Sequence, residues 1–177
     1  MTARDIATAW HRVEAVLRRR PEAGLCDDAP ATARWDGGTR VVASHANGTQ
    51  VLTDMPAELG GSGDQVSPGW LLRAGFASCT ATRIAMAAAA QGIELQALEV
   101  LASSRSDTRG LLGLADADGE PVPAGPSDVQ MRVRISAPRV PAQRLRELVE
   151  ESYRCSPTVC ALENAVPVAL RVEIATE

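Results

Sequence analysis

The chain has 177 residues, of which 45% are hydrophobic and only 3% aromatic, and its formal net charge is −4. This length suits one domain, or two small lobes that share a core, and the shortage of aromatic residues requires a core of Ala, Val and Leu. The acidic balance gives no support for nucleic-acid binding, and no apolar run reaches the ~18 residues that a membrane span needs. Because the Arg-rich start lacks an apolar signal core, we expect a cytoplasmic protein with no nucleic-acid or membrane partner.

The first thirty residues are predicted to lie outside the main domain. Residues 3–19 carry apolar side chains at helical spacing, which predicts an amphipathic helix that docks onto the body or onto a partner subunit. Residues 21–30 are a linker with Pro, Gly and two Asp. We therefore divide the chain into an N-terminal helix and linker, 1–30, and a main domain, 31–177.

From residue 31 the pattern changes to short strands. Asp36-Gly37-Gly38 and Asn47-Gly48 are hairpin signals, and a glycine-rich loop follows the last of the strands. The pattern predicts a three-stranded antiparallel meander with strands at 31–35, 39–45 and 50–54.

A long helix with few polar residues is predicted at the centre of the chain. Ser67 fits its N-cap, Pro68 its first position and Gly92 its stop. About 24 residues lie between these signals, enough for ~36 Å of helix. Small apolar residues surround nearly the whole cylinder, which predicts burial on most sides, with the sheets wrapped around it.

The second half of the chain alternates strands and helices. The predicted elements are a strand over 95–104, a long loop over 106–127, a half-buried strand over 129–135, a helix from Pro141 to about Arg154, a short helix from Pro157, and a final strand over Val166–Ile174 with Val168, Leu170, Val172 and Ile174 facing inward. This order predicts an α+β fold of mainly antiparallel sheets around a buried helix.

Four cysteines are the candidate chemical groups of the chain. They include no C-x-x-C pair, and the two histidines lie far apart, so we expect neither a metal site nor a cofactor. Cys26 lies in the linker and is most simply a bystander. The other three occupy two helices of the main domain.

Cys79 lies near the middle of the central helix, on the same face as Phe76 and Arg83. A reactive thiolate at this depth would need a cationic partner, and Arg83 is the nearest one in sequence. The alternative is a small buried residue in an alanine-rich helix, and the local pattern leaves both open.

Cys155 and Cys160 flank the start of the short helix. They occupy its N′ and N4 positions, which pack together in a hydrophobic staple, so we expect them to be neighbours. They are either two small packing residues or a pair within disulfide reach. The helix start would also lower the pKa of Cys160 modestly.

Several ordered motifs carry a family resemblance. Asp54-Met-Pro-Ala-Glu-Leu-Gly-Gly61, Ser67-Pro68, Ala77-Ser-Cys79, Ser156-Pro157, Leu162 and Val166-Pro-Val168 together resemble the OsmC/Ohr hydroperoxide-resistance family over roughly residues 31–176. The resemblance implies an intertwined homodimer with sites at its interface, in which two sheets enclose two central helices.

The resemblance also implies a thiol peroxidase. The position of the cysteine that attacks an organic hydroperoxide falls on Cys79, while the position of the second, resolving cysteine falls on Ser156. The glutamate position falls on Gly69, and the arginine position is best matched by Arg40, although the register could instead select Thr39. A dithiol, often lipoyl-linked, then reduces the disulfide.

We therefore expect an organic hydroperoxide reductase of oxidative-stress defence. Its candidate site residues are Cys79 as the reactive thiol, Arg40 or Arg83 as its stabiliser, and Cys155 or Cys160 as a substitute resolving thiol. The alternative is a non-catalytic dimer of the same fold that binds a small hydrophobic ligand, with Cys79 only a wall residue.

Overall fold

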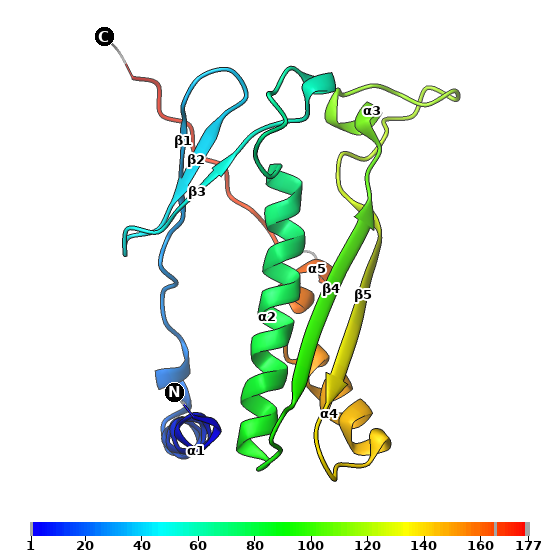
Figure 1. Cartoon of the computed structure of the whole chain (residues 1–177). Helices are drawn as coiled ribbons and strands as arrows, with labels where there is room; N and C mark the ends of the chain where they lie inside the picture. Colours follow the sequence, from blue (N-terminus) through cyan, green and yellow to red (C-terminus); the bar gives the residue numbers. More distant parts are fainter. Residues whose placement is uncertain (1, 165, 176–177) are drawn as a thin grey trace.

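The fold is organised around one long helix. The computed structural model describes residues 2–164 and 166–175. Helix α2 (Pro68–Ala90) stands upright in Figure 1, with Pro68 in its first turn. The Ser67 side chain accepts a hydrogen bond from the Trp70 N–H, which caps the helix start as predicted.

The remaining elements form an α+β arrangement of antiparallel sheets, as predicted. In chain order they are α1 (Ala3–Arg19), the 3-10 turn η1 (Pro21–Gly24), β1 (Thr32–Trp35), β2 (Val41–Ser44), β3 (Gln50–Thr53), the 3-10 turn η2 (Ala57–Leu59), β4 (Ala97–Arg105), α3 (Thr108–Leu111), β5 (Ser127–Ser136), α4 (Ala142–Arg154) and α5 (Pro157–Glu163). The order is β1-β2-β3 in one sheet, and β4 pairs with β5 in the other. None of the helices in the described ranges combines the length and hydropathy needed to cross a bilayer.

The core lies where the alanine-rich half of α2 meets its neighbours. Ile84, Ala87 and Ala88 of α2 pack with Leu148 of α4, and one face of the β4–β5 hairpin covers them. Along β4 the side chains alternate between half-buried and exposed, so only one face of the hairpin contacts α2. Because alanine side chains are short, the hairpin and α4 can approach the helix closely.

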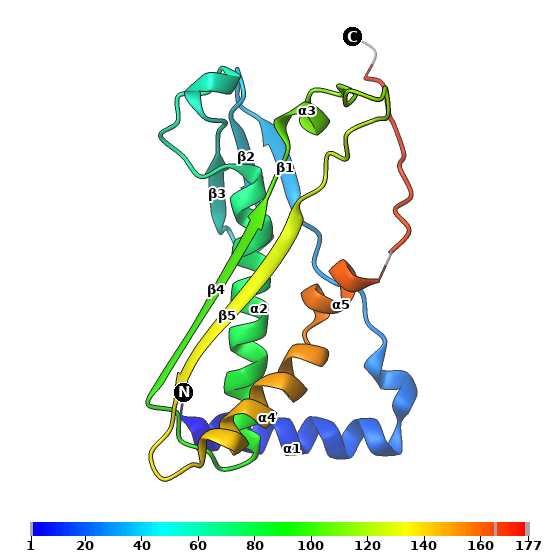
Figure 2. The ribbon, with the colours of Figure 1, turned by 90° about the vertical axis from the view of Figure 1, so that its right-hand side faces the viewer.

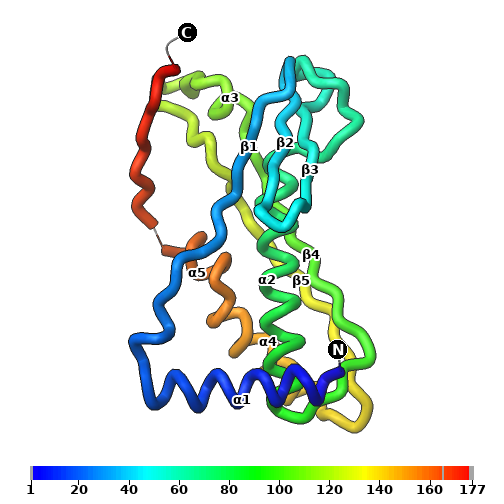
Figure 3. Tube along the Cα trace, turned by 90° about the vertical axis from the view of Figure 1, so that its left-hand side faces the viewer, coloured from blue at the N-terminus to red at the C-terminus, as the bar shows by residue number. Residues whose placement is uncertain are grey.

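Helix α1 lies across the foot of α2 (Figures 2 and 3). Thr2 and Asp5 form a capping box at its start. The Arg83 guanidinium of α2 lies 4.7 Å from the centre of the Trp10 ring, a cation–π contact that joins the two helices. Helix α1 therefore packs against the main body of its own chain, which was one of the two predicted ways for it to dock.

The final strand expected over Val166–Ile174 is wrong for the chain as described. The segment runs out from the body as an extended trace and takes part in no strand pairing among the described residues (Figure 3). The four apolar side chains predicted to face inward are 70–90% exposed. A strand needs a partner edge for its backbone hydrogen bonds, and within the described residues the segment pairs with no edge of either sheet. The last two residues of the predicted domain, 176–177, lie outside the described residues.

Candidate active site at Cys79

Cys79 lies where the middle of α2 meets the start of α5. Its side chain is half-buried, whereas the other three cysteines are exposed. Burial raises the pKa of the Cys79 thiol, but hydrogen bonds with the Ser156 hydroxyl and with the Thr158 N–H and hydroxyl outweigh burial. The net result is a pKa below the ordinary value of a cysteine, which favours the nucleophilic thiolate.

The hydroxyl groups around this thiol are themselves buried. The hydroxyls of Thr80 and Ser156 lie 3.2 Å apart, and both side chains are fully buried. The Thr158 hydroxyl lies 3.4 Å from that of Ser156. Each hydroxyl can rotate to donate or accept, so the cluster can turn its O–H groups toward a negative sulfur.

Local sequence explains why Ser156 faces α2. Pro157 occupies the first turn of α5 and fixes where this helix starts. Ser156 is its N-cap residue, yet the Ser156 side chain makes no capping hydrogen bond within α5. Its hydroxyl is therefore available to Thr80 and Cys79 across the helix contact.

The other cysteines do not share this environment. Cys155 is the C-cap of α4 and is exposed, as is Cys160 on α5. The Cys160 sulfur lies 3.5 Å from the Asn164 side-chain amide. The structure thus brings the Ser156 hydroxyl to Cys79, while the exposed thiols of Cys155 and Cys160 are absent from the groups that shift its pKa.

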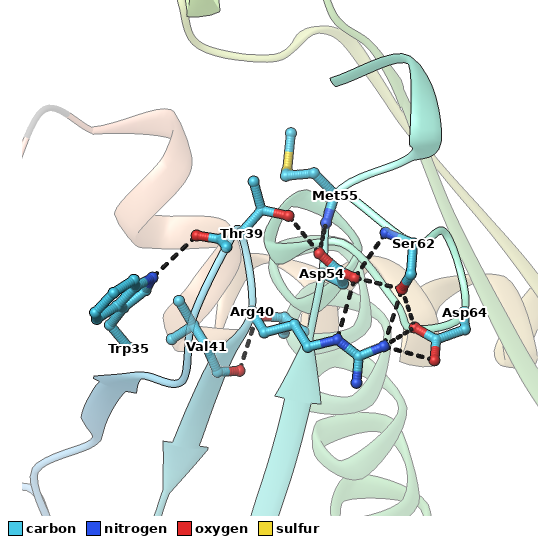
Figure 4. A network of polar contacts seen from close by, with 10 residues as sticks. Trp35, Thr39, Arg40, Val41, Asp54, Met55, Ser62 and Asp64 are labelled. Carbon is cyan, nitrogen blue, oxygen red and sulfur yellow. Dashed lines mark hydrogen bonds and ion pairs between the residues drawn. The ribbon is translucent and has the colours of Figure 1, made fainter. Parts of the chain in front are cut away.

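A second polar centre surrounds Asp54, close to the end of β3 (Figure 4). Its carboxylate is 2% exposed and accepts hydrogen bonds from the hydroxyls of Ser62 and Thr39 and from the N–H groups of Ser62 and Met55. The Ser62 and Thr39 hydroxyls are the main causes that hold the pKa of Asp54 far below its usual range. Gly61 is required here because a Cβ at this position would overlap the Met55 carbonyl.

Arg40 belongs to this centre. Its Nε lies 3.5 Å from Asp54 Oδ2, and its Nη2 lies 2.7 Å from Asp64 Oδ2 and donates to the Ser62 hydroxyl (Figure 4). Two carboxylates therefore neutralise the arginine that the sequence matched to the family position. Gly69, at the family's glutamate position, contributes no side chain to this pairing.

Arg83 also points away from the role that sequence spacing suggested. Its guanidinium lies over Trp10, and within the described residues no hydrogen-bond partner meets its buried Nη1. The groups that lower the pKa of Cys79 are the neutral donors Ser156 and Thr158, with neither arginine among them.

An apolar pocket lies between α2, β5, α4 and α5. It has a volume of about 280 Å³ and is lined by Phe76, Val129, Met131, Tyr153, Val159, Leu162 and Glu163. Phe76 precedes Cys79 by three residues on α2, and Val159 follows Thr158 on α5, so two of the lining residues are close neighbours of the site in sequence. The Tyr153 hydroxyl donates a 2.7 Å hydrogen bond to Glu163 at the pocket wall.

No metal-ligand set accompanies these groups. Across residues 2–164 and 166–175, no three His, Cys, Asp or Glu side chains cluster in a way that could hold a metal ion.

Sequence reasoning did not identify Thr80, Thr158 or the Asp54 centre as functional. Thr80 directly follows Cys79, and Thr158 directly follows the Ser156-Pro157 motif, so proximity to matched motifs was the available signal. The role of Ser156 as a hydrogen-bond partner, in contrast, depends on the packing of α5 against α2, which no local pattern encodes.

Asp54→Asn tests the carboxylate centre. Because the folded state lowers the pKa of Asp54, its charge stabilises the fold fully above the ordinary aspartate pKa, and this stabilisation is lost progressively as pH falls below that value toward the lower folded-state pKa. We expect the variant to have a lower Tm than wild type at pH 7, with a difference that shrinks below about pH 4. Thermal unfolding followed by circular dichroism at several pH values measures this. Asp118→Asn, in an exposed loop, is the control, and a pH-independent deficit for Asp54→Asn would contradict the assignment.

Ser156→Ala tests the hydroxyl contact at the thiol. Removing this hydroxyl takes away a hydrogen bond that favours the thiolate, so the pKa of Cys79 should rise. The measurement is the pH dependence of Cys79 alkylation by iodoacetamide, read by peptide mass spectrometry. Ser78→Ala is the matched control, because Ser78 is exposed and its hydroxyl donates to the Gly75 carbonyl. Equal profiles for the two variants would show that Ser156 does not act on the thiol.

Comparison with known proteins places the chain in a family. A family model described as OsmC-like protein matches residues 61–171. The fold is similar to that of an OsmC-like protein from Mycoplasma pneumoniae (17% identity, 80% of this chain and 91% of that chain, TM-score 0.64). It is also similar to the organic hydroperoxide resistance protein OsmC from Legionella pneumophila (20% identity, 78% and 90%, TM-score 0.57) and to the organic hydroperoxide resistance protein OhrB of Bacillus subtilis (22% identity, 78% and 93%, TM-score 0.51).

A comparison with curated protein sequences finds no significant match. The structural likenesses lie between 17% and 22% identity and establish the fold. Since the family model covers well over half of the chain, the protein belongs to the OsmC-like family.

Proposed function

We propose that the protein is a thiol-dependent peroxidase that reduces organic hydroperoxides in the cytoplasm, with Cys79 as its nucleophile. The observation that carries this proposal is the half-buried Cys79 thiol, whose pKa the Ser156 and Thr158 hydrogen bonds lower. Membership of the OsmC-like family and the names of two structural neighbours, organic hydroperoxide resistance proteins, support it. The four free cysteines suit a reducing compartment.

The reaction follows from thiolate chemistry. The Cys79 sulfur attacks the terminal oxygen of the hydroperoxide, an S–O bond forms, and the O–O bond breaks. The released alkoxide takes one proton from water and leaves as an alcohol. Sulfur is oxidised to sulfenic acid while the peroxide is reduced, and thiol reductant must then restore the site.

The apolar pocket favours an organic hydroperoxide over hydrogen peroxide. Most of its lining is hydrocarbon or aromatic, including Phe76, Val159 and Leu162. Such a wall removes an alkyl or aryl group from water, at roughly 25 cal/mol per Å² of apolar surface buried, and hydrogen peroxide has no such surface to bury. The distal end of the substrate would lie there, with its peroxide oxygens toward Cys79.

Turnover of cumene hydroperoxide with excess dithiothreitol tests the activity. Wild-type protein should consume the peroxide, whereas Cys79→Ser should fall to the background rate of the thiol alone, because serine is not an effective nucleophile toward peroxide. A variant with the exposed Cys26→Ser controls for loss of any thiol. Equal rates for wild type and Cys79→Ser would refute a peroxidase centred on this cysteine.

The same pocket supports a second candidate, a binding protein without turnover. A small hydrophobic ligand would occupy the space beside Phe76, and Cys79 would serve only as part of the wall. Native mass spectrometry, together with the cumene hydroperoxide assay, distinguishes the peroxidase from the binding protein. A co-purifying ligand retained by both wild type and Cys79→Ser, together with no peroxide turnover, would favour the binding protein.

We further propose that the active form is a homodimer. The alternating apolar residues of the segment 166–174 stay exposed in the single chain, and Trp70 and Leu72 on α2 are also 46% and 44% exposed. An open groove of about 540 Å³ between β5 and α4 is lined mainly by apolar side chains. Isolated soluble chains rarely leave this much apolar surface uncovered, and a second copy would pair with the segment and cover it.

Leu170→Asp combined with Val172→Asp tests the dimer. Two charges on the apolar side of segment 166–174 should prevent its pairing, so the variant should elute as a monomer or aggregate, whereas wild type elutes as a dimer. Light scattering coupled to size-exclusion chromatography measures the mass. Arg171→Ser lies on the opposite side of the alternation and should stay dimeric. A monomeric wild type, or a dimer unaffected by the two aspartates, would contradict the proposal.

A further inference from the structure

Among the described residues, Cys79 forms no disulfide, and it is the half-buried cysteine while the other three are exposed. Thr80, the next residue on α2, has a buried hydroxyl 3.2 Å from the buried hydroxyl of Ser156. The Ser156 and Thr158 side chains are the groups that lower the pKa of Cys79. Hydroxyl groups can hydrogen bond to a sulfenic acid, but they cannot form a disulfide with it. A protein that oxidises Cys79 must therefore reach another sulfur to complete its cycle.

The two thiols closest in sequence to Ser156, those of Cys155 and Cys160, are exposed rather than turned into the contact with α2. On α5, Val159 is 4% exposed and Ser156 is fully buried against α2, whereas Cys160 is exposed. Turning Cys160 toward Cys79 would require α5 to rotate, and that rotation would carry Val159 out of the core. Cys155 precedes Ser156 as the exposed C-cap of α4, so it too would have to replace a buried serine at the contact.

We propose that a separate small-molecule thiol releases oxidised Cys79 through a mixed disulfide, and that no cysteine of the protein resolves it. The inference rests on the proposed peroxidase function and adds the class of its second substrate. Cys79 is half-buried rather than sealed, so a small thiol can approach it from solvent.

The cycle balances with two equivalents of the small thiol. The first thiol's sulfur forms an S–S bond with Cys79 sulfenic acid, whose S–O bond breaks, and the oxygen leaves as water. The second attacks the small-molecule sulfur of that mixed disulfide, which breaks the S–S bond to Cys79 and releases the Cys79 thiol. The two small thiols leave as their disulfide, so the two electrons that reduced the peroxide come from them.

The first experiment identifies what Cys79 is bonded to. Reduced, full-length protein receives one equivalent of cumene hydroperoxide in the presence of 2-mercaptoethanol, and peptide mass spectrometry then maps every disulfide. We expect a mercaptoethanol adduct on Cys79. A disulfide from Cys79 to Cys26, Cys155 or Cys160 of either subunit would overturn the inference and leave the peroxidase intact. An unmodified Cys79 would instead refute the peroxidase itself.

Turnover by a variant that lacks the three exposed cysteines provides a test that does not depend on disulfide mapping. The triple variant Cys26→Ser/Cys155→Ser/Cys160→Ser should turn over cumene hydroperoxide with 2-mercaptoethanol as fast as wild type. A loss of about tenfold or more, in protein with an unchanged circular dichroism spectrum, would show that one of these thiols takes part. All three are exposed, so their removal leaves the core packing unaltered.

Ser156→Cys is the converse variant. It places a sulfur where the hydroxyl now contacts Cys79, so one equivalent of hydroperoxide should produce a disulfide between Cys79 and the new thiol. Excess hydroperoxide without thiol should drive wild-type Cys79 to sulfinic acid, while the variant should resist this. Wild type that resists over-oxidation as well as the variant does would contradict the inference, because it would reveal an internal resolving thiol.

Discussion

The burial of one face of α2 is the constraint on which the rest of the structure depends, and the burial on most sides that the sequence predicts is not reached in the single chain. The alanine-rich half of α2 lets β4, β5 and α4 approach closely, and the short side chains at Ala87 and Ala88 set that distance. The same burial fixes which face of α2 meets α5, and therefore which groups surround Cys79. A helix this apolar also leaves residues such as Trp70 uncovered in the single chain, which is the physical reason for proposing a second copy.

Sequence patterns predicted the elements that local chemistry determines. Ser67 and Pro68 start α2, the Gly and Asn turns separate β1, β2 and β3, and alternating apolar residues mark β4 and β5. The segment 166–174 has the same alternation, but alternation does not supply a partner edge. Alternation therefore shows that the segment has strand propensity, but it does not show that the segment pairs with a strand of the same chain.

The sequence predicted which helix positions form the candidate site, but it did not predict which side chains surround the Cys79 thiol. Family motifs selected Cys79 and Ser156 at the helices that meet, and the family model then confirmed the fold. Sequence spacing suggested a cation beside the thiol, yet Arg40 pairs with Asp54 and Asp64, and Arg83 lies over Trp10. Ion pairs between distant segments depend on tertiary packing, which spacing along one helix cannot reveal. Neutral donors at the start of α5 take the place that an arginine was expected to fill.

The most direct test compares the four cysteines with one another in the same sample. Cumene hydroperoxide is added at less than one equivalent, and dimedone trapping with peptide mass spectrometry reports which residue is oxidised first. Exposure alone would favour Cys26, Cys155 and Cys160, whereas the hydrogen bonds at the contact of α2 and α5 favour Cys79. We predict that Cys79, the least exposed of the four, is oxidised first. Preferential oxidation of the exposed cysteines would contradict a reactive thiol at this contact.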